Sequence, residues 1–408
     1  MKSNKLKKNY FNRITVLFLS VIFLAACTKN LSTETTNPLL QETAAIAPIH
    51  VYGLQSMTEA QWSGVQSFDV SLLFGKYATN GLSYSGTLPA NYLMVTPNVR
   101  DQGQIGACTG FCGAETEAIL KYYQANAPQS ISGILTSSTG LATAVANQFT
   151  SPTSIFGTNG ALSPLFLYYV ERVAIRKEAI SADNGANMVN IGQALQGTVA
   201  NTSSSLVSYN GTNFKGTSTE DLYPYPSVIN ANGYNVATSS STNYLTAPSS
   251  AAILNAPNFS LALQTGSTTN SNTGATTSHG YYVITSTGST LLTDVKTALA
   301  NNKPVMMGFN VYDNTSTYAY FEHLNTTSYT YNPLTTSGKL ATGVRLLGGH
   351  AVPIVGYIND SSKPGGGVFI VENSWGKPWG YYGFFYLPYS VIQSTTIVPS
   401  GSLYVAIL

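Results

Sequence analysis

Three short segments carry residue types that together can perform nucleophilic acyl transfer. A glycine-rich loop leads to Cys108 at the expected start of a helix, where the helix dipole lowers the pKa of a thiol. His350 leads into an apolar strand, and Asn373 follows the next strand, 23 residues further on. A cysteine, a histidine and an amide at the ends of regular elements fit a nucleophile, a base and a group that orients the base.

These residues lie in or beside predicted helices and strands, with the helices mostly earlier in the chain and the strands later. The spacing of apolar residues predicts helices over 108–124, 165–177, 189–196 and 294–301, and strands over 304–311, 350–357, 367–372 and 381–387. Ser163 and Pro164 suit the N-cap and first position of the second helix. Helices segregated from strands indicate an α+β fold.

The three segments together resemble those of papain-like cysteine peptidases. The matching motifs are Asp101-Gln102-Gly103 with Gly106-Ala107-Cys108, Gly349-His350-Ala351-Val352, and Asn373-Ser374-Trp375-Gly376. The resemblance runs from about Leu88 to Leu408. It implies a papain-like fold of two subdomains: a helical left domain with the catalytic helix at its N-terminus and an antiparallel, β-barrel-like right domain.

The resemblance also implies roles for individual residues. Cys108 is expected to attack a peptide carbonyl as a thiolate, with His350 as acid and base and Asn373 orienting the imidazole. Gln102 is expected to donate its side-chain N–H to the oxyanion hole. For substrate binding the resemblance implies Gly185, Ala186, Gly349 and Trp375, the last also covering the contact between His350 and Asn373.

The sequence departs from the best-known members of this family in two ways. Thr109 replaces the aromatic residue that usually follows the nucleophile, and Ile105 replaces a disulfide-forming cysteine. His350 also lies 242 residues after Cys108, against roughly 130 in those members. A large insertion is therefore expected, roughly over residues 200–290, and a neutral stretch from 222 to 293 is predicted to form extended strands and loops.

Two other functions compete with a thiol-dependent peptidase. The large neutral insertion could occlude the site and leave a catalytically silent papain-like domain that serves as a binding or adhesion module. Another Cys/His acyl-transfer enzyme, such as a peptidoglycan amidase or a transglutaminase-like protein, is the second alternative. The sequence Asn373-Ser374-Trp375-Gly376 after the histidine disfavours it.

The charge pattern excludes a nucleic-acid-binding protein and points to export. Charged residues make up only 9% of the chain, and five of the 19 basic residues lie before the apolar run Ile14–Ala26. That run has 13 residues, fewer than the roughly 20 of a membrane-spanning helix, so residues 1–26 are predicted to be a signal peptide. The remaining 14 basic and 17 acidic residues give a slightly acidic mature protein.

The signal ends in Leu24-Ala25-Ala26-Cys27, which resembles a bacterial lipobox. Cys27 is therefore the expected lipidation site, and the protein is expected in the bacterial cell envelope, outside the cytoplasm, anchored to the membrane or released by processing. Residues 27–86 are predicted as a tether and possible pro-segment, and 87–408 as the peptidase domain. We expect polypeptide substrates, a monomer, no cofactor and no metal. Cys112 is predicted to be a buried structural thiol, and His50, His279 and His323 to be surface residues.

Overall fold

The structure is a computed structural model of the 408-residue chain. It describes residues 50–73, 87–125, 140–146, 161–199, 205–226, 228–229, 235–236, 241–261, 280–314, 317 and 320–408. The chain divides into two compact units, Met1–Ala44 and Ala45–Leu408, and every described residue belongs to the second. The predicted signal peptide, Cys27 and His279 lie outside the described residues.

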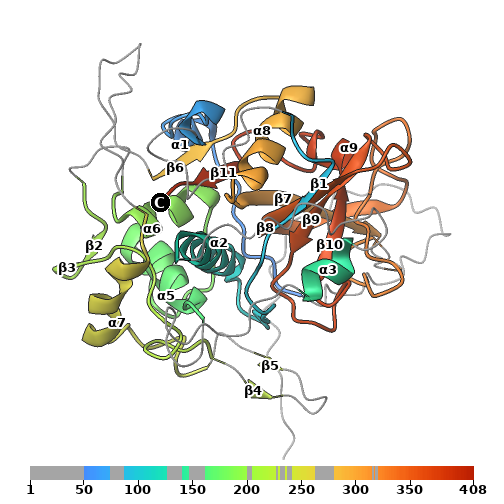
Figure 1. The fold of residues 1–408 in the computed structure, drawn as a ribbon. Helices are drawn as coiled ribbons and strands as arrows, with labels where there is room; N and C mark the ends of the chain where they lie inside the picture. The colour runs from blue at the N-terminus through green and yellow to red at the C-terminus, as the bar shows by residue number, and fades with distance from the viewer. Residues whose placement is uncertain are drawn as a thin grey trace, which may run out of the picture. The chain divides into compact units, whose positions relative to one another are not determined.

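Helices of the second unit gather beside the long helix α2, which begins at Cys108. Figure 1 shows α2 between the sheet and the helices α5, α6 and α7. The α-helices are α1 (Glu59–Trp62), α2 (Cys108–Ala125), α3 (Gly140–Ala146), α5 (Pro164–Tyr169), α6 (Met188–Gln196), α7 (Ser250–Asn255), α8 (Gly288–Ala300) and α9 (Tyr389–Ile392). A π-helix, η3 (Val170–Ile175), continues α5, and 3-10 helices cover η1 (Val70–Leu73) and η4 (Ala256–Phe259).

The main sheet has seven antiparallel strands in the order β10-β9-β8-β7-β11-β6, with β1 paired to β8. Its strands are β1 (Asn91–Leu93), β6 (Tyr281–Val283), β7 (Val305–Asn314), β8 (Val344–Asn359), β9 (Gly367–Glu372), β10 (Phe384–Pro388) and β11 (Leu403–Ala406). Two small hairpins pair β2 (Ser208–Tyr209) with β3 (Thr212–Asn213), and β4 (Val228–Ile229) with β5 (Asn235–Val236). The described strands form an open path and not a closed barrel, so the expected barrel-like right domain is here an open sheet.

Two hydrophobic clusters fill the unit. One surrounds the sheet and its covering helices α8 and α9, and the other surrounds α2, α5 and α6. Cys108 belongs to the helical cluster, as does Ala351, which follows His350 on β8. Because α2 packs directly against β8, the two clusters meet where the catalytic cysteine and histidine were predicted.

Most predicted elements are present, several of them with different bounds. The helix predicted at 165–177 begins at Pro164 after the N-cap Ser163, whose Oγ accepts a hydrogen bond from the Phe166 amide at 3.1 Å. It changes to a π-helix at Val170. The helix predicted at 294–301 begins six residues earlier, at Gly288. Its first turns contain serine and threonine, which are weak helix formers, so the sequence does not indicate them.

The neutral stretch 222–293 is not made of strands and loops alone, as predicted. It contains α7, whose N-cap Ser249 accepts a hydrogen bond from the Ala252 amide at 3.2 Å. It also contains β6, which pairs with β11 at the end of the main sheet. At least one strand of the central sheet therefore lies within the range 200–290 that was predicted as an insertion.

The part of the N-terminal region from residue 57 to 73 packs on the rest of the unit. Val65, Phe68 and Leu73 are buried. The Phe68 amide donates to the Val283 carbonyl of β6 at 2.7 Å, and the Val283 amide donates to Gln66 at 2.9 Å. This region is therefore attached to the fold and is not a free linker.

Candidate active site

Cys108 occupies the first position of α2 and is completely buried. The preceding loop turns tightly, with the Ala107 amide donating to the Ile105 carbonyl at 2.8 Å. The side chain has 0% exposed surface, and the thiol is free. The backbone amide of Ala351, next to His350 on β8, hydrogen-bonds the thiol. The sulfur therefore lies where the helical half and the sheet meet.

His350 and Asn373 lie on the neighbouring strand β8 and just beyond the end of β9. Their side chains are joined by a hydrogen bond of 2.7 Å between His350 Nε2 and Asn373 Oδ1. The other ring nitrogen, Nδ1, has no hydrogen-bond partner in the described part of the chain. Because Asn373 fixes Nε2, Nδ1 is the nitrogen left to exchange a proton with Cys108.

Aromatic rings enclose His350. The indole of Trp375 lies 5.0 Å from the imidazole between ring centroids, and the rings of Phe309 and Phe321 lie 5.8 and 6.2 Å away. His350 and Asn373 have 0% exposed surface. This enclosure excludes water from the hydrogen bond that orients the imidazole, which is the role predicted for Trp375.

Gln102 is held beside Asn373 by Ser374. Its side-chain Oε1 accepts a hydrogen bond from Ser374 Oγ at 2.6 Å, and its backbone amide donates to the Ser374 carbonyl at 2.8 Å. Since Oε1 is fixed in this way, Nε2 must point the other way. It donates to the carbonyls of Ile105 at 3.0 Å and Val51 at 3.2 Å. The donor predicted for the oxyanion hole is therefore already bonded, in part to the N-terminal region.

Residues 50–57, which we call the cleft segment, run through the site. The Leu54 amide donates to the Gly349 carbonyl at 3.0 Å, and the Gln55 amide donates to the Ala186 carbonyl at 2.8 Å. The Ala186 amide in turn donates to the Gly53 carbonyl at 2.9 Å. Residues predicted to bind substrate backbone thus bind the protein's own backbone.

Gly53 lies closest to the nucleophile, and only glycine fits there. A Cβ atom at this position would come within 1.8 Å of the Gly106 carbonyl oxygen, in the loop that leads to Cys108. The Gly53 backbone also hydrogen-bonds the Cys108 thiol. The absence of a side chain at residue 53 lets the cleft segment lie directly over the cysteine.

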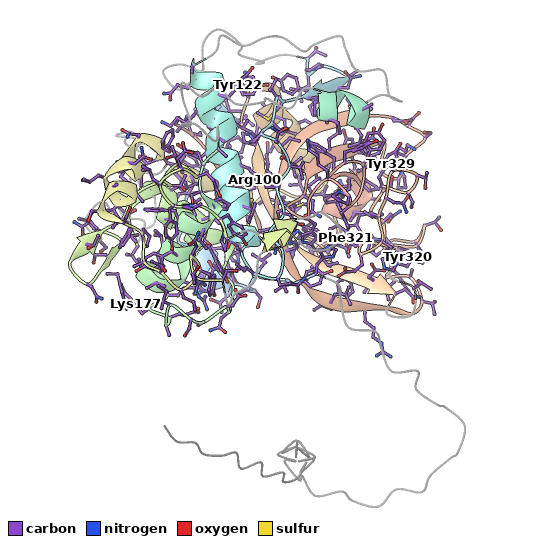
Figure 2. The ribbon with its side chains drawn as sticks, turned by 90° about the horizontal axis from the view of Figure 1, so that it is seen from below. Arg100, Tyr122, Lys177, Tyr320, Phe321 and Tyr329 are labelled. Atoms are coloured by element: carbon purple, nitrogen blue, oxygen red, sulfur yellow. The ribbon has the colours of Figure 1, made fainter. Side chains whose placement is uncertain are left out.

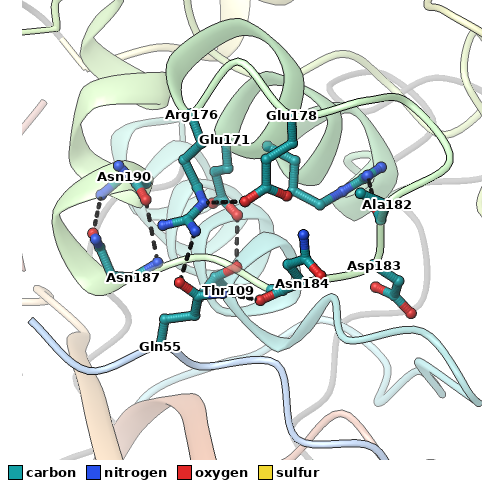
Figure 3. Close-up of polar contacts among 12 residues, drawn as sticks. Gln55, Thr109, Glu171, Arg176, Glu178, Ala182, Asp183, Asn184, Asn187 and Asn190 are labelled. Carbon is teal, nitrogen blue, oxygen red and sulfur yellow. Dashed lines mark hydrogen bonds and ion pairs between the residues drawn. The ribbon is translucent and has the colours of Figure 1, made fainter.

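An arginine side chain and a backbone carbonyl hold Gln55 at one end of the cleft segment. Arg176 Nη2 donates to Gln55 Oε1 at 2.7 Å, while Gln55 Nε2 donates to the carbonyl of Asn184 (Figure 3). Glu178 accepts from Arg176 Nε at 2.8 Å and fixes the guanidinium. Beside Leu54, a cavity of about 200 Å³ extends along the site, lined by Met188, Phe309 and Gly349 among others.

His50 anchors the other end of the cleft segment, and the prediction that it is a surface residue is wrong. Its ring stacks on Trp375 with centroids 3.8 Å apart and an angle of 3° between planes. His50 Nδ1 lies 2.7 Å from Glu322 Oε2, and Tyr52 donates its hydroxyl to Glu322 Oε1 at 2.5 Å. The sequence gives no signal for these contacts, because the residues that meet are about 270 positions apart.

Burial favours the neutral forms of Cys108 and His350 in this arrangement. Loss of solvent raises the pKa of Cys108 to about 12, although the amides of Ala351 and Gly53 partly oppose the shift. Burial also lowers the pKa of His350 to about 4, against the stabilising hydrogen bond from Asn373. Both shifts have the same main cause, because burial disfavours the charged form of each group.

Buried carboxyl groups lie on and beside α2. Figure 2 shows Arg100 beside α2, where its Nε lies 3.9 Å from Glu115 Oε1 and its Nη1 donates to Glu220 Oε2 at 3.1 Å. Burial raises the pKa of Glu115 to about 7, partly offset by Arg100. Burial also raises the pKa of Glu372, immediately before Asn373, and Glu115 adds to this rise.

The residue after the nucleophile is bonded to a further buried acid. Thr109 donates its hydroxyl to Glu171 Oε2 at 2.6 Å, and burial raises the pKa of Glu171 to about 8. The hydroxyl at this position, where the family resemblance leads one to expect an aromatic ring, thus has a specific partner.

The remaining features concern Cys112, metal-binding groups and membrane-spanning helices. Cys112 is a free thiol with 1% exposed surface, so its prediction as a buried cysteine is confirmed. Among the described residues, no group of three or more His, Cys, Asp or Glu side chains is arranged to hold a metal ion. No helix within the described ranges has the length and apolar character needed to cross a membrane.

Comparisons with known proteins show the family to which the chain is related. A family model described as papain family cysteine protease matches residues 197–401. The chain belongs to the papain family of cysteine proteases. The matched stretch contains His350 and Asn373, while Gln102 and Cys108 precede it.

Individual relatives share shorter stretches. The chain is 32% identical over 103 residues to an uncharacterized peptidase C1-like protein of Acanthamoeba polyphaga mimivirus, covering 25% of this chain and 28% of that protein. It is 35% identical over 91 residues to a cathepsin B-like protein of Giardia intestinalis, covering 22% and 24%. The chain thus spans about a quarter of the length of these curated relatives.

A solved structure shares the fold over nearly its whole length. Xylellain, a cysteine protease from Xylella fastidiosa, superposes with a TM-score of 0.54 at 20% identity, over 89% of this chain and 97% of that one. The predicted papain-like α+β fold is therefore confirmed, apart from the open sheet noted above.

Proposed function

We propose that this protein is a thiol-dependent peptidase that hydrolyses peptide bonds of polypeptide substrates through a thioester on Cys108. The observation that carries the proposal is the bond between Asn373 and His350 Nε2, which leaves Nδ1 without a partner among the described residues, while the amide of the next residue, Ala351, bonds the Cys108 thiol. The proposed reaction uses only side chains and backbone amides of the chain itself.

In the proposed reaction the Cys108 thiolate attacks the peptide carbonyl carbon while the His350 imidazolium holds the proton taken from the thiol. Gln102 Nε2 and the Cys108 backbone amide stabilise the negative oxygen of the tetrahedral intermediate. His350 then gives its proton to the leaving amine as the C–N bond breaks, and the acyl group stays on the sulfur. Finally His350 removes a proton from water, which attacks the thioester and releases the carboxylate and Cys108.

We further propose that the arrangement described above is a latent form. Cys108 has no exposed surface, and the carbonyl of Val51 takes a hydrogen bond from the oxyanion donor Gln102. Substrate therefore has to replace residues 50–57, either after cleavage between residues 57 and 87 or by simple displacement. This gives the predicted pro-segment, residues 27–86, an inhibitory role.

The same burial supports a second candidate, a silent papain-like binding module in which the cleft segment never leaves. The two candidates differ in one respect: a latent peptidase gains activity when the segment is displaced, and a silent module does not.

The anchor is a separate proposal, supported by the lipobox-like sequence before Cys27. We propose a monomeric protein in the bacterial cell envelope, held by lipid on Cys27 and freed if the chain is cut near residue 86. Mass spectrometry of the membrane fraction should find the lipidated N-terminal peptide, and Cys27→Ser should move the protein to the soluble fraction.

A peptide library tests the proposed activity. The full-length variant carrying His50→Ala, Tyr52→Ala and Gly53→Ala, which we call the opened variant, loses the contacts of His50 and Tyr52 with Trp375 and Glu322 and gains a methyl group that clashes with Gly106. It should cleave peptides, and the same variant with Cys108→Ala should not. A folded opened variant without any peptide hydrolysis would favour the silent module.

A further inference from the structure

Glu322 is a buried carboxylate whose position is fixed by the backbone around it. The amides of residues 320, 321 and 322 donate to the Asp313 carboxylate at 2.9, 2.7 and 2.9 Å. This holds the loop that carries Phe321, whose ring packs 5.1 Å from Trp375 between centroids, and Glu322 (Figure 2 labels Phe321). The Glu322 side chain has 0% exposed surface.

The partners of Glu322 in the structure come from the cleft segment. Each carboxylate oxygen has its own partner: Oε2 meets His50 Nδ1 at 2.7 Å, and Oε1 accepts from the Tyr52 hydroxyl at 2.5 Å. Both partners leave with the segment when the site opens. A carboxylate with two acceptor positions is then left beside an indole face that His50 had covered in a parallel stack.

We propose that Trp375 and Glu322 form a subsite that binds a planar cationic side chain of the substrate, arginine first and histidine second. This inference rests on the proposed peptidase function and deepens it. A guanidinium is flat, stacks on aromatic faces and donates two parallel N–H bonds to a carboxylate. It can therefore replace the His50 ring on Trp375 and fill both acceptor positions of Glu322 at once.

The position of the subsite relative to His350 determines which part of the substrate it binds. His350 must stand beside the leaving amine to protonate it. Trp375 lies next to His350 and contacts His50 at one end of the cleft segment, whereas Ala186 binds Gln55 at the other end. The arginine is thus expected on the amine side of the scissile bond, C-terminal to it.

A lysine should bind less well than arginine at this subsite. Its ammonium is a compact charge without a plane, so it cannot stack on the indole and engage both oxygens together. Citrulline has the shape of arginine without the charge, and is the matched control for the charge of the guanidinium.

Binding measured without turnover tests the inference independently of catalysis. The protein is the full-length opened variant with Cys108→Ala, and the ligands are acetylated hexapeptide amides of alanine that carry one arginine, citrulline or lysine at successive positions. Isothermal titration calorimetry should show one position at which arginine binds about tenfold more tightly than citrulline, the value of one charge-assisted hydrogen bond. Lysine should fall between them.

Two further variants assign the preference to Glu322. Glu322→Gln should remove the difference between arginine and citrulline, whereas Asp360→Asn, which changes a fully exposed carboxylate, should keep it. Equal or undetectable binding of both peptides, or a preference that persists in Glu322→Gln, would overturn the inference. An arginine preference without peptide hydrolysis by the opened variant would leave the subsite standing and contradict only the proposed activity.

Discussion

Replacing Gly53 by alanine should activate the protein without touching its catalytic residues. The added methyl group would lie 1.8 Å from the Gly106 carbonyl oxygen, and a contact of this kind cannot be relieved by rotating a side chain, because both atoms are tied to the backbone. The cleft segment must therefore move by more than 1 Å. This movement breaks the hydrogen bond between Gly53 and Ala186 and shifts the neighbouring residues of the segment away from their own hydrogen-bond partners.

The size of the effect follows from the cost of that overlap. Overpacking of a closely packed site costs about 1–3 kcal/mol, and a backbone clash belongs in the upper half of that range. A loss of about 2–3 kcal/mol from the docked state raises the fraction of open molecules about 30- to 150-fold. The rate at which Cys108 reacts should rise by the same factor while the docked form remains the major one.

The assay is alkylation of Cys108 by iodoacetamide, followed by peptide mapping, with hydrolysis of a fluorogenic peptide measured in parallel. Ser56→Ala is the matched control, because Ser56 is an exposed residue of the same segment. Both rates should rise in Gly53→Ala and stay at the wild-type value in Ser56→Ala. Equal alkylation rates in Gly53→Ala and the wild type, with both proteins folded, would show that the segment does not control access to Cys108.

Three other predictions follow from the same contacts. Gln102→Ala in the opened variant should lower kcat about 10²- to 10³-fold with little change in KM, since the lost donor acts on the tetrahedral intermediate; an unchanged kcat in steady-state assays would remove Gln102 from the oxyanion hole. His50→Arg in the wild-type chain should slow alkylation of Cys108, because arginine binds Trp375 and Glu322 more tightly than histidine; faster alkylation would contradict this. The raised pKa of Glu115, about 7, means that the folded state resists its ionisation, so the stability contributed by the protonated form is present below about pH 4.5 and is lost as the pH rises toward 7. Glu115→Gln should therefore raise the Tm at pH 8 and change it little at pH 4.5, and thermal melts that differ equally from wild type at both pH values would refute the shift.

Much of the catalytic geometry could be predicted from the sequence, because local motifs encode it. Cys108 starts a helix after a tight glycine-rich loop, His350 lies within β8, and Asn373 follows the end of the neighbouring strand β9. The apolar runs of both strands are visible in the sequence. The helix predicted over 189–196 is observed over Met188–Gln196, one residue longer at its start. Its ends carry clear signals, because Asn187 caps the start and Gly197 takes a left-handed conformation with φ of 80° at the end.

The cleft segment could not be predicted because long-range contacts define it. Residues 50–57 have no regular secondary structure, and their neighbours in space come from α6, β8 and the loop at 320–322. His50 became important only through Trp375 and Glu322, each more than 270 positions away. The sequence does not indicate the first turns of α8, because serine and threonine there have weak helix propensity. In the structure, packing of Leu291 and Val295 in the core outweighs that weak propensity.

The central claim is that Cys108 is a catalytic nucleophile that the protein's own residues 50–57 cover. The most direct measurement is mass spectrometry of the opened variant after treatment with an epoxide or vinyl-sulfone reagent, alongside residual peptide hydrolysis. We expect one adduct on Cys108 and none on Cys112. Hydrolysis should fall in proportion to labelling, and the wild-type chain should be labelled far more slowly. A folded opened variant whose Cys108 stays unlabelled, or whose hydrolysis survives complete labelling, would contradict it.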